Sequence, residues 1–394
     1  MELKAELELL RGRPIDVVEN FEDDSGCNET SDATQLCKHP VVSVQMVTYN
    51  HEKFVRQALD GVLSQQTDFE FEVVIGEDVS TDSTRAICFE YQRKFPDKMR
   101  VLWSEKNVGS ARNHVRVSNH CRGEFIAFCD GDDFWTDPLK LSRQVVAMRE
   151  HPSAALCFCG SKILSQESGK MRDYDCSAFR PGLIPGKEFF WLFMLGRDIS
   201  GTVGNEGFIM TSTALVRAES FRQMRAKYEI FKWRLTLSDT IRWIGMSQVG
   251  DVVYLPEQVS TYRVHQSGAL TTNGWKVAVD ATIVRLWWSI QVFGGTVNEW
   301  MTAYINLLVH NLRGNFSLKP MKMQREAAKA LWRVKFVRHH LLRPDVLFTY
   351  LVARLGLMNR YVMFVIGKPL KALRSQRRLE FLRPFYVKTF GKEP

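Results

Sequence analysis

The 394 residues exceed one small domain and are enough to bury a sizeable core. With 45% hydrophobic and 25% charged residues, the chain is neither collagen-like, low-complexity nor wholly disordered. Its net charge of +9 is uneven: residues 311–394 carry 19 Lys and Arg against 4 Asp and Glu, and the remaining residues sum to −6. This asymmetry indicates an anionic partner for the C-terminal end, either a membrane surface or nucleic acid.

Residues 1–39 are predicted to be an N-terminal extension that is partly disordered. Within it, Glu2–Leu10 fits a short amphipathic helix, and Asn20–Gln35 has the acidic, polar composition of a mobile linker. The first ten residues have neither the basic start nor the apolar run of a secretory signal. Eight Cys in a chain of this length are not the density of a disulfide scaffold, so we expect free thiols in a reducing, cytosolic compartment.

Short β-rich runs then alternate with helical periodicity. A helix is predicted over Glu52–Gln65, and another over Ala86–Lys94 after the capping residues Asp82-Ser83-Thr84. The predicted strands are Val41–Tyr49, Phe71–Gly76, Met99–Trp103 and Glu124–Cys129. This alternation predicts βαβ units, and therefore an α/β fold with a mostly parallel, Rossmann-like sheet. In such sheets ligands bind beyond the carboxyl ends of the strands.

The pattern is less regular after a predicted helix at Leu139–Arg149. Residues 151–270 contain a predicted helix at Asp239–Met246 and a strand at Asp251–Leu255. From Val277 onward the sequence predicts almost continuous helix. The predicted domains are therefore 1–39, 40–270 and a helical, basic region at 271–394.

The C-terminal region offers no uninterrupted apolar run of about 20 residues, the length that a membrane span requires. The best candidate, Val346–Ile366, is broken by Arg354 and Arg360. Basic residues between positions 371 and 383 alternate with apolar ones, which favours an amphipathic helix lying at the surface of an anionic membrane. A helical subdomain with a basic face, or a nucleic-acid surface, are the alternatives, and we expect no nucleic acid.

The most specific local feature is Asp130-Gly131-Asp132-Asp133 at the end of a predicted buried strand. Three neighbouring carboxylates repel one another unless a hard cation lies among them, and Mg²⁺ or Mn²⁺ favours oxygen ligands. A solvated Asp-rich turn is the alternative. The pair Cys157-x-Cys159 has the residue type of a soft metal site but lacks a matching second pair.

A second acidic turn, Glu77-Asp78, also follows a predicted strand and precedes a helix. A carboxylate here can accept a hydrogen bond from the imide N–H of a base such as uracil, and a helix N-terminus favours phosphate. Helix capping accounts for the same residue types.

Six segments, in order and spacing, resemble the family 2 glycosyltransferases, which have the GT-A nucleotide-sugar-binding fold. The segments are VSVQMVTYNHEKFVRQALDGVLSQ, FEVVIGEDVSTDST, EKNVGSARN, GEFIAFCDGDDFWTDPLKLSRQV, LSDTIRW and VYLPEQVSTYRVHQSG. They extend from about Val41 to His265, somewhat over half the chain. The resemblance is to bacterial members that build surface polysaccharide or modify lipid-linked glycans.

The resemblance implies roles for individual residues. Thr48 and Asn50 would line the nucleotide pocket, and Asp78 would bind the uracil ring. Asn107, Gly109 and Asn113 would shape the loop beside the ribose and the donor sugar. Asp130 and Asp132 would form the DxD pair that holds the donor diphosphate and Mn²⁺ or Mg²⁺, with His265 as a further ligand. Asp239 would be the general base of an inverting reaction.

The sequence departs from the family pattern at three points. Glu77 stands where many members have Asp, Val79 replaces a small residue, and Ser238-Asp239 replaces Glu-Asp. The expected protein is thus a cytoplasmic, metal-dependent, inverting glycosyltransferase at the inner face of the cell membrane. It would use a UDP-sugar and a glycan or lipid-linked acceptor in cell-surface polysaccharide synthesis. A nucleotidyltransferase on a related fold and a non-catalytic sugar-nucleotide-binding scaffold are the alternatives.

Overall fold

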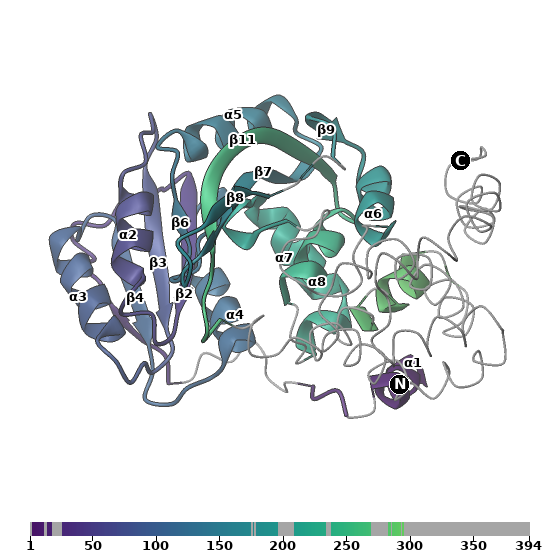
Figure 1. Cartoon of the computed structure of the whole chain (residues 1–394), viewed down its shortest axis with the longest axis horizontal. Helices are drawn as coiled ribbons and strands as arrows, with labels where there is room; N and C mark the ends of the chain where they lie inside the picture. The colour runs from purple at the N-terminus through teal and green to yellow at the C-terminus, as the bar shows by residue number, and fades with distance from the viewer. Residues whose placement is uncertain are drawn as a thin grey trace. The chain divides into compact units, whose positions relative to one another are not determined.

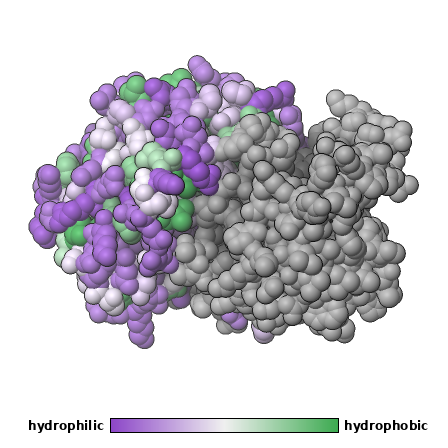
Figure 2. All heavy atoms as spheres, in the orientation of Figure 1, coloured by the Kyte–Doolittle hydropathy of each residue, from purple (hydrophilic) through white to green (hydrophobic). Residues whose placement is uncertain are grey.

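The computed structural model describes residues 2–11, 14–17, 26–174, 176, 179–195, 209–233, 238–268, 283–284, 286–292 and 294. Residues 16–196 and 204–272 form one compact unit, which contains the sheet. In the orientation of Figure 2, the surface of the described residues is mostly hydrophilic, with apolar residues scattered over it. Within the described part of the chain, no helix is both long and apolar enough to cross a membrane.

The first half of this unit consists of βαβ units, as the sequence predicts. Its elements are β2 (Val42–Thr48), α2 (Val55–Leu63), β3 (Phe71–Glu77), α3 (Thr84–Lys94), β4 (Met99–Trp103), α4 (Ser110–His120) and β5 (Phe125–Phe128). The strands lie in the order β4-β3-β2-β5, and all these neighbours are parallel. The direction of strand addition therefore reverses between β2 and β5. This reversal makes the carboxyl ends of these two strands the expected ligand-binding edge.

Both faces of these strands are covered. All seven residues of β2 and all seven of β3 are buried, as expected for parallel strands with helices on both sides. In Figure 1 the strands lie between α2 and α3 on one side and α4 on the other. Helix α4, which the sequence analysis did not predict, packs against β2 and β3. A Cβ at Gly76 of β3 would lie 2.3 Å from Asn113 Oδ1, so the glycine permits this close approach.

The second half adds mainly antiparallel strands. After β6 (Phe134–Trp135) and α5 (Lys140–Glu150) come β7 (Ala154–Ser165), β8 (Met171–Asp173), β9 (Gly182–Ile184), β10 (Leu215–Arg217) and β11 (Asp251–Val264). The sheet continues from β5 as β10-β7-β11-β6. The expectation of a less regular region was therefore wrong for β7, a twelve-residue strand that pairs in parallel with β11.

Strand β11 is much longer than the predicted Asp251–Leu255. Its pairing with β7 shifts between Leu255 and Gln258, around Pro256, because proline has no N–H to donate to the ladder. The strand bends strongly (Figure 1). The bend lets one strand pair with β7 along its length and also reach β6, at Ser260 and Thr261.

The predicted mobile linker is also corrected in part. Asn28–Thr30 forms β1, which pairs with β4 and extends the sheet by one strand. Glu29 accepts hydrogen bonds from Arg100 Nε at 2.9 Å and Nη2 at 2.8 Å. A bidentate ion pair of this kind fixes orientation as well as charge, so this part of the extension belongs to the sheet.

The remaining helices are α6 (Gly186–Leu195), α7 (Ala218–Lys227), α8 (Ser238–Met246) and the 3₁₀ turns η1 (Thr211–Thr213) and η2 (Glu229–Lys232). The predicted helix at Asp239–Met246 is confirmed. The predicted N-terminal helix is confirmed as α1 (Glu2–Arg11), which belongs to the second of the two units. Residues 283–284 and 286–292 are helical. Residues 346–366, which are too interrupted by charges for a span, and residues 371–383, for which contact with a membrane surface is predicted, lie outside the described residues.

Candidate active site at the carboxyl ends of the strands

The polar turns that follow β2, β3 and β5 meet at one edge of the sheet. Thr48 is the last residue of β2, and the Asp130 turn follows β5 beside it. A Cβ at Gly131 would lie 2.6 Å from Thr48 Oγ1 and 3.0 Å from His51 Nδ1. The glycine between the two aspartates therefore lets the acidic turn pass directly over the end of β2.

The three aspartates of this turn have different surroundings. Asp133 is buried, and both of its oxygens are engaged: Ser212 Oγ donates to Oδ2 at 2.7 Å, and the main-chain N–H of Arg263 donates to Oδ1 at 2.9 Å. Asp130 and Asp132 are partly exposed, at 27% and 23% of their side chains. Asp133 thus fixes the turn to η1 and β11, whereas Asp130 and Asp132 face outward.

Two histidines converge on Asp132. His265 Nε2 lies 3.1 Å from Asp132 Oδ2, and His51 Nε2 lies 3.7 Å from the same oxygen. His265 follows β11, and its ring packs 4.8 Å from that of Phe54, while its Nδ1 lies 3.0 Å from Ser267 Oγ. The structure therefore brings the predicted residues Asp132 and His265 together, and it adds His51.

The pKa values of the two aspartates in this cluster are shifted in opposite directions. Burial, followed by the neighbouring charge of Asp132, raises the pKa of Asp130 to about 7. Burial would also raise the pKa of Asp132, but His51 and His265 outweigh it and hold that pKa below its usual range. Burial lowers the pKa of His51. Two carboxylates that resist ionising together form a site that a cation would stabilise.

Arg263 on β11 holds the main chain of the acidic turn in place. Its Nε donates to the carbonyl oxygen of Asp132 at 2.8 Å, and its guanidinium also reaches Gln57 at 2.7 Å. The guanidinium lies between the rings of Phe54 and Phe134, at 4.7 and 5.0 Å from their centroids. The turn is thereby held by the main chain and a planar cation together.

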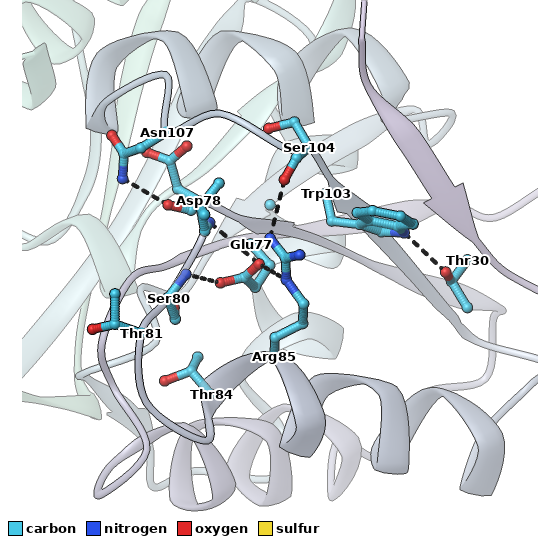
Figure 3. Close-up of polar contacts among 12 residues, drawn as sticks. Thr30, Glu77, Asp78, Ser80, Thr81, Thr84, Arg85, Trp103, Ser104 and Asn107 are labelled. Carbon is cyan, nitrogen blue, oxygen red and sulfur yellow. Dashed lines mark hydrogen bonds and ion pairs between the residues drawn. The ribbon is translucent and has the colours of Figure 1, made fainter.

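The second part of the edge surrounds Asp78 (Figure 3). The Asp78 carboxylate accepts hydrogen bonds from the main-chain N–H groups of Val108 at 2.8 Å and Gly109 at 2.9 Å. Asn107 Nδ2 donates to the carbonyl oxygen of Asp78 at 2.6 Å. Gly109 has a φ of +83°, which glycine adopts without strain. The resulting loop is built around Asp78, whose pKa is raised by burial.

Glu77, the residue before Asp78, supports this loop through buried contacts. Its buried carboxylate forms an ion pair with Arg85 and accepts the Ser80 N–H at 2.6 Å. Arg85 in turn donates to the carbonyl oxygen of Ser104 at 3.1 Å and lies over the Trp103 ring (Figure 3). The departure from the family's Asp at position 77 therefore has a structural counterpart, since the longer Glu side chain closes the turn and reaches α3.

Asn50 and Asn113 both connect elements. Asn50 has a φ of +55°, and its Oδ1 accepts the Thr81 N–H at 2.8 Å, which joins the turns after β2 and β3. Asn113 is buried in α4, and its Nδ2 donates to the carbonyl oxygen of Gly76 at 2.8 Å. The structure places Asn50 at the surface of the edge and Asn113 within the packing behind it.

Asp239 lies in the first turn of α8. Its charge acts on Asp130, where it contributes to the raised pKa of that carboxyl group. The structure therefore places the predicted base within electrostatic range of the acidic turn. Burial of Arg242, one turn further along α8, lowers its pKa, and the charges of Asp239 and Asp130 oppose this.

The side chains at this edge fit a hard divalent cation whose coordination is completed by a bound ligand. In the described part of the chain no group of three or more His, Cys, Asp or Glu is arranged to hold a metal. Mg²⁺ and Mn²⁺ sites commonly use one or two carboxylates together with substrate phosphates. Asp130 and Asp132 supply such carboxylates, so the residues present fit a cation bound jointly with a diphosphate.

Three residues at this edge escaped the sequence analysis: His51, His114 and Arg263. His51 was recognisable in principle, because it stands three residues after Thr48 at the same strand end. Arg263 stands two residues before His265 in a segment that carries the resemblance, but its contact with Asp132 depends on the fold. His114 lies on α4 with Nε2 4.0 Å from Asp130 Oδ1, and nothing local to it signals this position.

An α/β sheet with acidic turns at its strand reversal defines the class as a GT-A type nucleotide-sugar-binding fold. The crystal structure of S. aureus TarS 1-349 in complex with UDP-GlcNAc is similar in fold: it aligns with a TM-score of 0.54 at 18% identity, over 79% of this chain and 90% of that one. The predicted fold class is thus confirmed for the described sheet.

Residues 43–224 match the family described as Glycosyl transferase family 2. The predicted resemblance to this family is therefore confirmed over residues 43–224. The uncharacterized protein Rv1520 of Mycobacterium tuberculosis is 31% identical over 229 residues, 58% of this chain and 60% of its own length. TuaG of Bacillus subtilis, provisionally named a teichuronic acid biosynthesis glycosyltransferase, is 33% identical over 128 residues, 32% of this chain and 49% of TuaG. The chain thus spans about 60% of the length of the mycobacterial relative.

Proposed function

We propose that this chain transfers a sugar from a nucleotide diphosphate donor to a hydroxyl group of a glycan or lipid-linked acceptor. The observation that carries the proposal is the meeting of two clusters at one sheet edge. One is the loop around Asp78, and the other is the outward-facing pair Asp130 and Asp132 with His265. Their combination matches two parts of a nucleotide sugar, the base and the diphosphate.

A UDP-sugar is the donor that the base-side loop favours. Asp78 is 3% exposed and already accepts the Val108 and Gly109 N–H groups, so a hydrogen bond from the imide N–H of uracil would use a remaining lone pair of its carboxylate. Thr48, Asn50 and Asn107 belong to the same turns and would line the nucleotide. The complex of TarS with UDP-GlcNAc supports this choice by analogy.

Asp130 and Asp132 would hold Mn²⁺ or Mg²⁺ jointly with the donor diphosphate, with His265 as a further ligand in that complex and His51 beside Asp132. When bound, the cation neutralises the charge that develops on the diphosphate leaving group. Asp132 is kept ionised by its two histidines. Arg263 and Asp133 fix the main chain of the turn, so the carboxylates are held in place before the donor arrives.

Asp239 would remove the proton from the acceptor hydroxyl. The acceptor oxygen attacks the anomeric carbon, the bond from that carbon to the diphosphate oxygen breaks, and the hydroxyl proton passes to the Asp239 carboxylate. One displacement with the base opposite the leaving group inverts the anomeric configuration.

The cellular setting is part of the proposal. The predicted division into 1–39, 40–270 and 271–394 leaves a C-terminal region whose last 84 residues carry 19 Lys and Arg against 4 Asp and Glu, a net charge of +15. Lys and Arg near an anionic membrane contribute about 1 kcal/mol each, which supports a cytoplasmic enzyme bound peripherally at the inner face of the membrane. The function would then be cell-surface polysaccharide synthesis. Flotation with anionic but not neutral liposomes tests this location, and equal flotation with both contradicts it.

The chemistry is tested by incubating the full chain with a panel of UDP-sugars and Mn²⁺ and measuring release of UDP, with water as acceptor. We expect cation-dependent release, lost in Asp132→Asn together with Mn²⁺-dependent UDP binding. Asp239→Asn should keep UDP binding while transfer falls by about 10²–10⁴-fold. Pyrophosphate release from a nucleoside triphosphate would instead indicate a nucleotidyltransferase. UDP-sugar binding without turnover on any acceptor would indicate a scaffold.

A further inference from the structure

A line of buried polar side chains leads from α4 to the acidic turn. Ser118 and His114 on α4 and Gln45 in the middle of β2 are each buried. Ser118 Oγ lies 2.7 Å from Gln45 Oε1, and Gln45 Nε2 lies 2.8 Å from His114 Nδ1. The line ends at the first aspartate of the pair, because His114 Nε2 is 4.0 Å from Asp130 Oδ1.

The hydrogen bonds fix which ring nitrogen of His114 carries the proton. The amide atom of Gln45 that contacts Nδ1 also lies 3.3 Å from the carbonyl oxygen of His114. A carbonyl oxygen only accepts, so this amide atom is the nitrogen, and it donates to both groups. Nδ1 is therefore the acceptor, and in the neutral ring the proton is on Nε2, the nitrogen that faces Asp130.

The ring is neutral and firmly held. Burial lowers the pKa of His114 well below its usual range, and the nearby charge of Arg242 lowers it further. The Gln45 side chain is held by Ser118 Oγ, which donates to its Oε1 at 2.7 Å, and the main-chain carbonyl oxygen of Gln45 accepts the N–H of Cys129, the residue before Asp130. The donor and the carboxylate that it faces are thus both attached to the middle of the sheet.

We propose that His114 is a positioning residue for Asp130, with its Nε2–H holding Oδ1 so that Oδ2 is presented to the cation and the donor diphosphate. The inference rests on the proposed function. At 4.0 Å the pair is about 1 Å beyond a hydrogen bond, and such contacts tighten when the ligand binds. A donor on Asp130 also offsets the repulsion from Asp132. Hydrogen bonds that orient metal-binding carboxylates typically contribute 10–100-fold to metal affinity.

Two matched substitutions separate this role from packing. In His114→Asn the amide oxygen can replace Nδ1 as the acceptor for Gln45, but the side chain is too short to reach Asp130. In His114→Gln the longer amide can place an N–H where Nε2 lies. Both variants keep a polar group in the buried site, so the pair differs mainly in its reach toward Asp130.

The experiment is calorimetric titration of UDP, with GDP alongside, into the full chain with and without Mn²⁺, and with thermal midpoints recorded. We expect His114→Asn to weaken Mn²⁺-dependent binding by 10–100-fold, with metal-free binding unchanged, and His114→Gln to restore it to within a few-fold. Unchanged Mn²⁺-dependent binding in His114→Asn overturns the inference alone. If both variants lose the same nucleotide affinity, or if His114→Asn loses the same affinity with and without Mn²⁺, His114 serves packing only and the inference is overturned as well. Absence of Mn²⁺-dependent binding of either nucleotide by the wild-type chain overturns the proposed function itself.

Discussion

Adding a single methyl group at Gly131 should lower the activity while leaving the stability of the fold nearly unchanged. A Cβ there would lie 2.6 Å from Thr48 Oγ1, 2.9 Å from Thr48 Cβ and 3.0 Å from His51 Nδ1. Carbon contacts are optimal at about 3.5–4.0 Å, so the shortfall is close to 1 Å. The turn has no easy way to retreat, because Gly131 N–H is bonded to the carbonyl oxygen of Val47 at 3.0 Å.

In Gly131→Ala the strain must therefore be relieved by moving the turn that carries Asp130 and Asp132. A misplacement of about 1 Å at a reacting centre costs roughly 100-fold in rate, which corresponds to about 2.7 kcal/mol. We expect kcat/KM for UDP release to fall by about this factor. The thermal midpoint should change little, since the turn lies at the edge of the sheet and not in its core.

The assay is initial-rate UDP release with Mn²⁺, carried out on a double-mutant cycle with Thr48→Ala. Removing Oγ1 eliminates the shortest contact, so the double variant should recover about tenfold relative to the value expected from adding the two single effects. Additive losses would show that the contact with Thr48 Oγ1 is not the cause, since the Cβ contact remains in Thr48→Ala. Wild-type activity in Gly131→Ala would refute the argument from close approach altogether.

Three further predictions concern stability. Lys140 is fully buried, and burial lowers its pKa to about 8, below the ordinary value of about 10.4. Its charge therefore costs about 3 kcal/mol of folding free energy below pH 8, and the free energy of unfolding in urea should rise between about pH 8 and 10.5. This rise should be smaller in Lys140→Met than in the exposed control Lys170→Met. Val79 has a φ of +63°, a strained conformation for a β-branched residue, so Val79→Gly should stabilise the chain by about 0.5–1 kcal/mol in the same assay, and destabilisation would contradict the strain. Glu77→Ala removes a buried partner of Arg85 and should cost about 3 kcal/mol while weakening UDP binding without Mn²⁺; unchanged UDP affinity would show that the turn does not support the base-side loop.

The elements that the sequence predicts well are those in which the pattern of apolar residues matches the residues that the fold buries. The runs at β2, β3, β4 and β5 are apolar and short, so their position could be predicted to within one or two residues. Helix α4 was missed because its sequence, SARNHVRVSNH, is mostly polar. Its polar residues are buried by hydrogen bonds to other elements, as Asn113 is by Gly76, and periodicity of apolar residues cannot reveal a helix of this kind.

The long strands β7 and β11 were missed or shortened for a different reason. Their pairing joins residues about a hundred positions apart, from Asp251 with Ala154 to Val264 with Ser165. Pro256 interrupts the strand pattern of β11 locally, and only the neighbouring strand shows that pairing resumes beyond it. Strand β1 is similar, since three polar residues become a strand by pairing with β4.

By itself the sequence determined the alternation of strands and helices and the acidic turns at the strand ends, because spacing and residue type are local properties. It could not rank Asp130, Asp132 and Asp133. That ranking was decided by Ser212 and Arg263, which engage Asp133, and by His265 and His51, which approach Asp132. A carboxylate has the same chemistry at all three positions, and only the groups that the fold places around it decide whether it fixes the chain or faces a ligand.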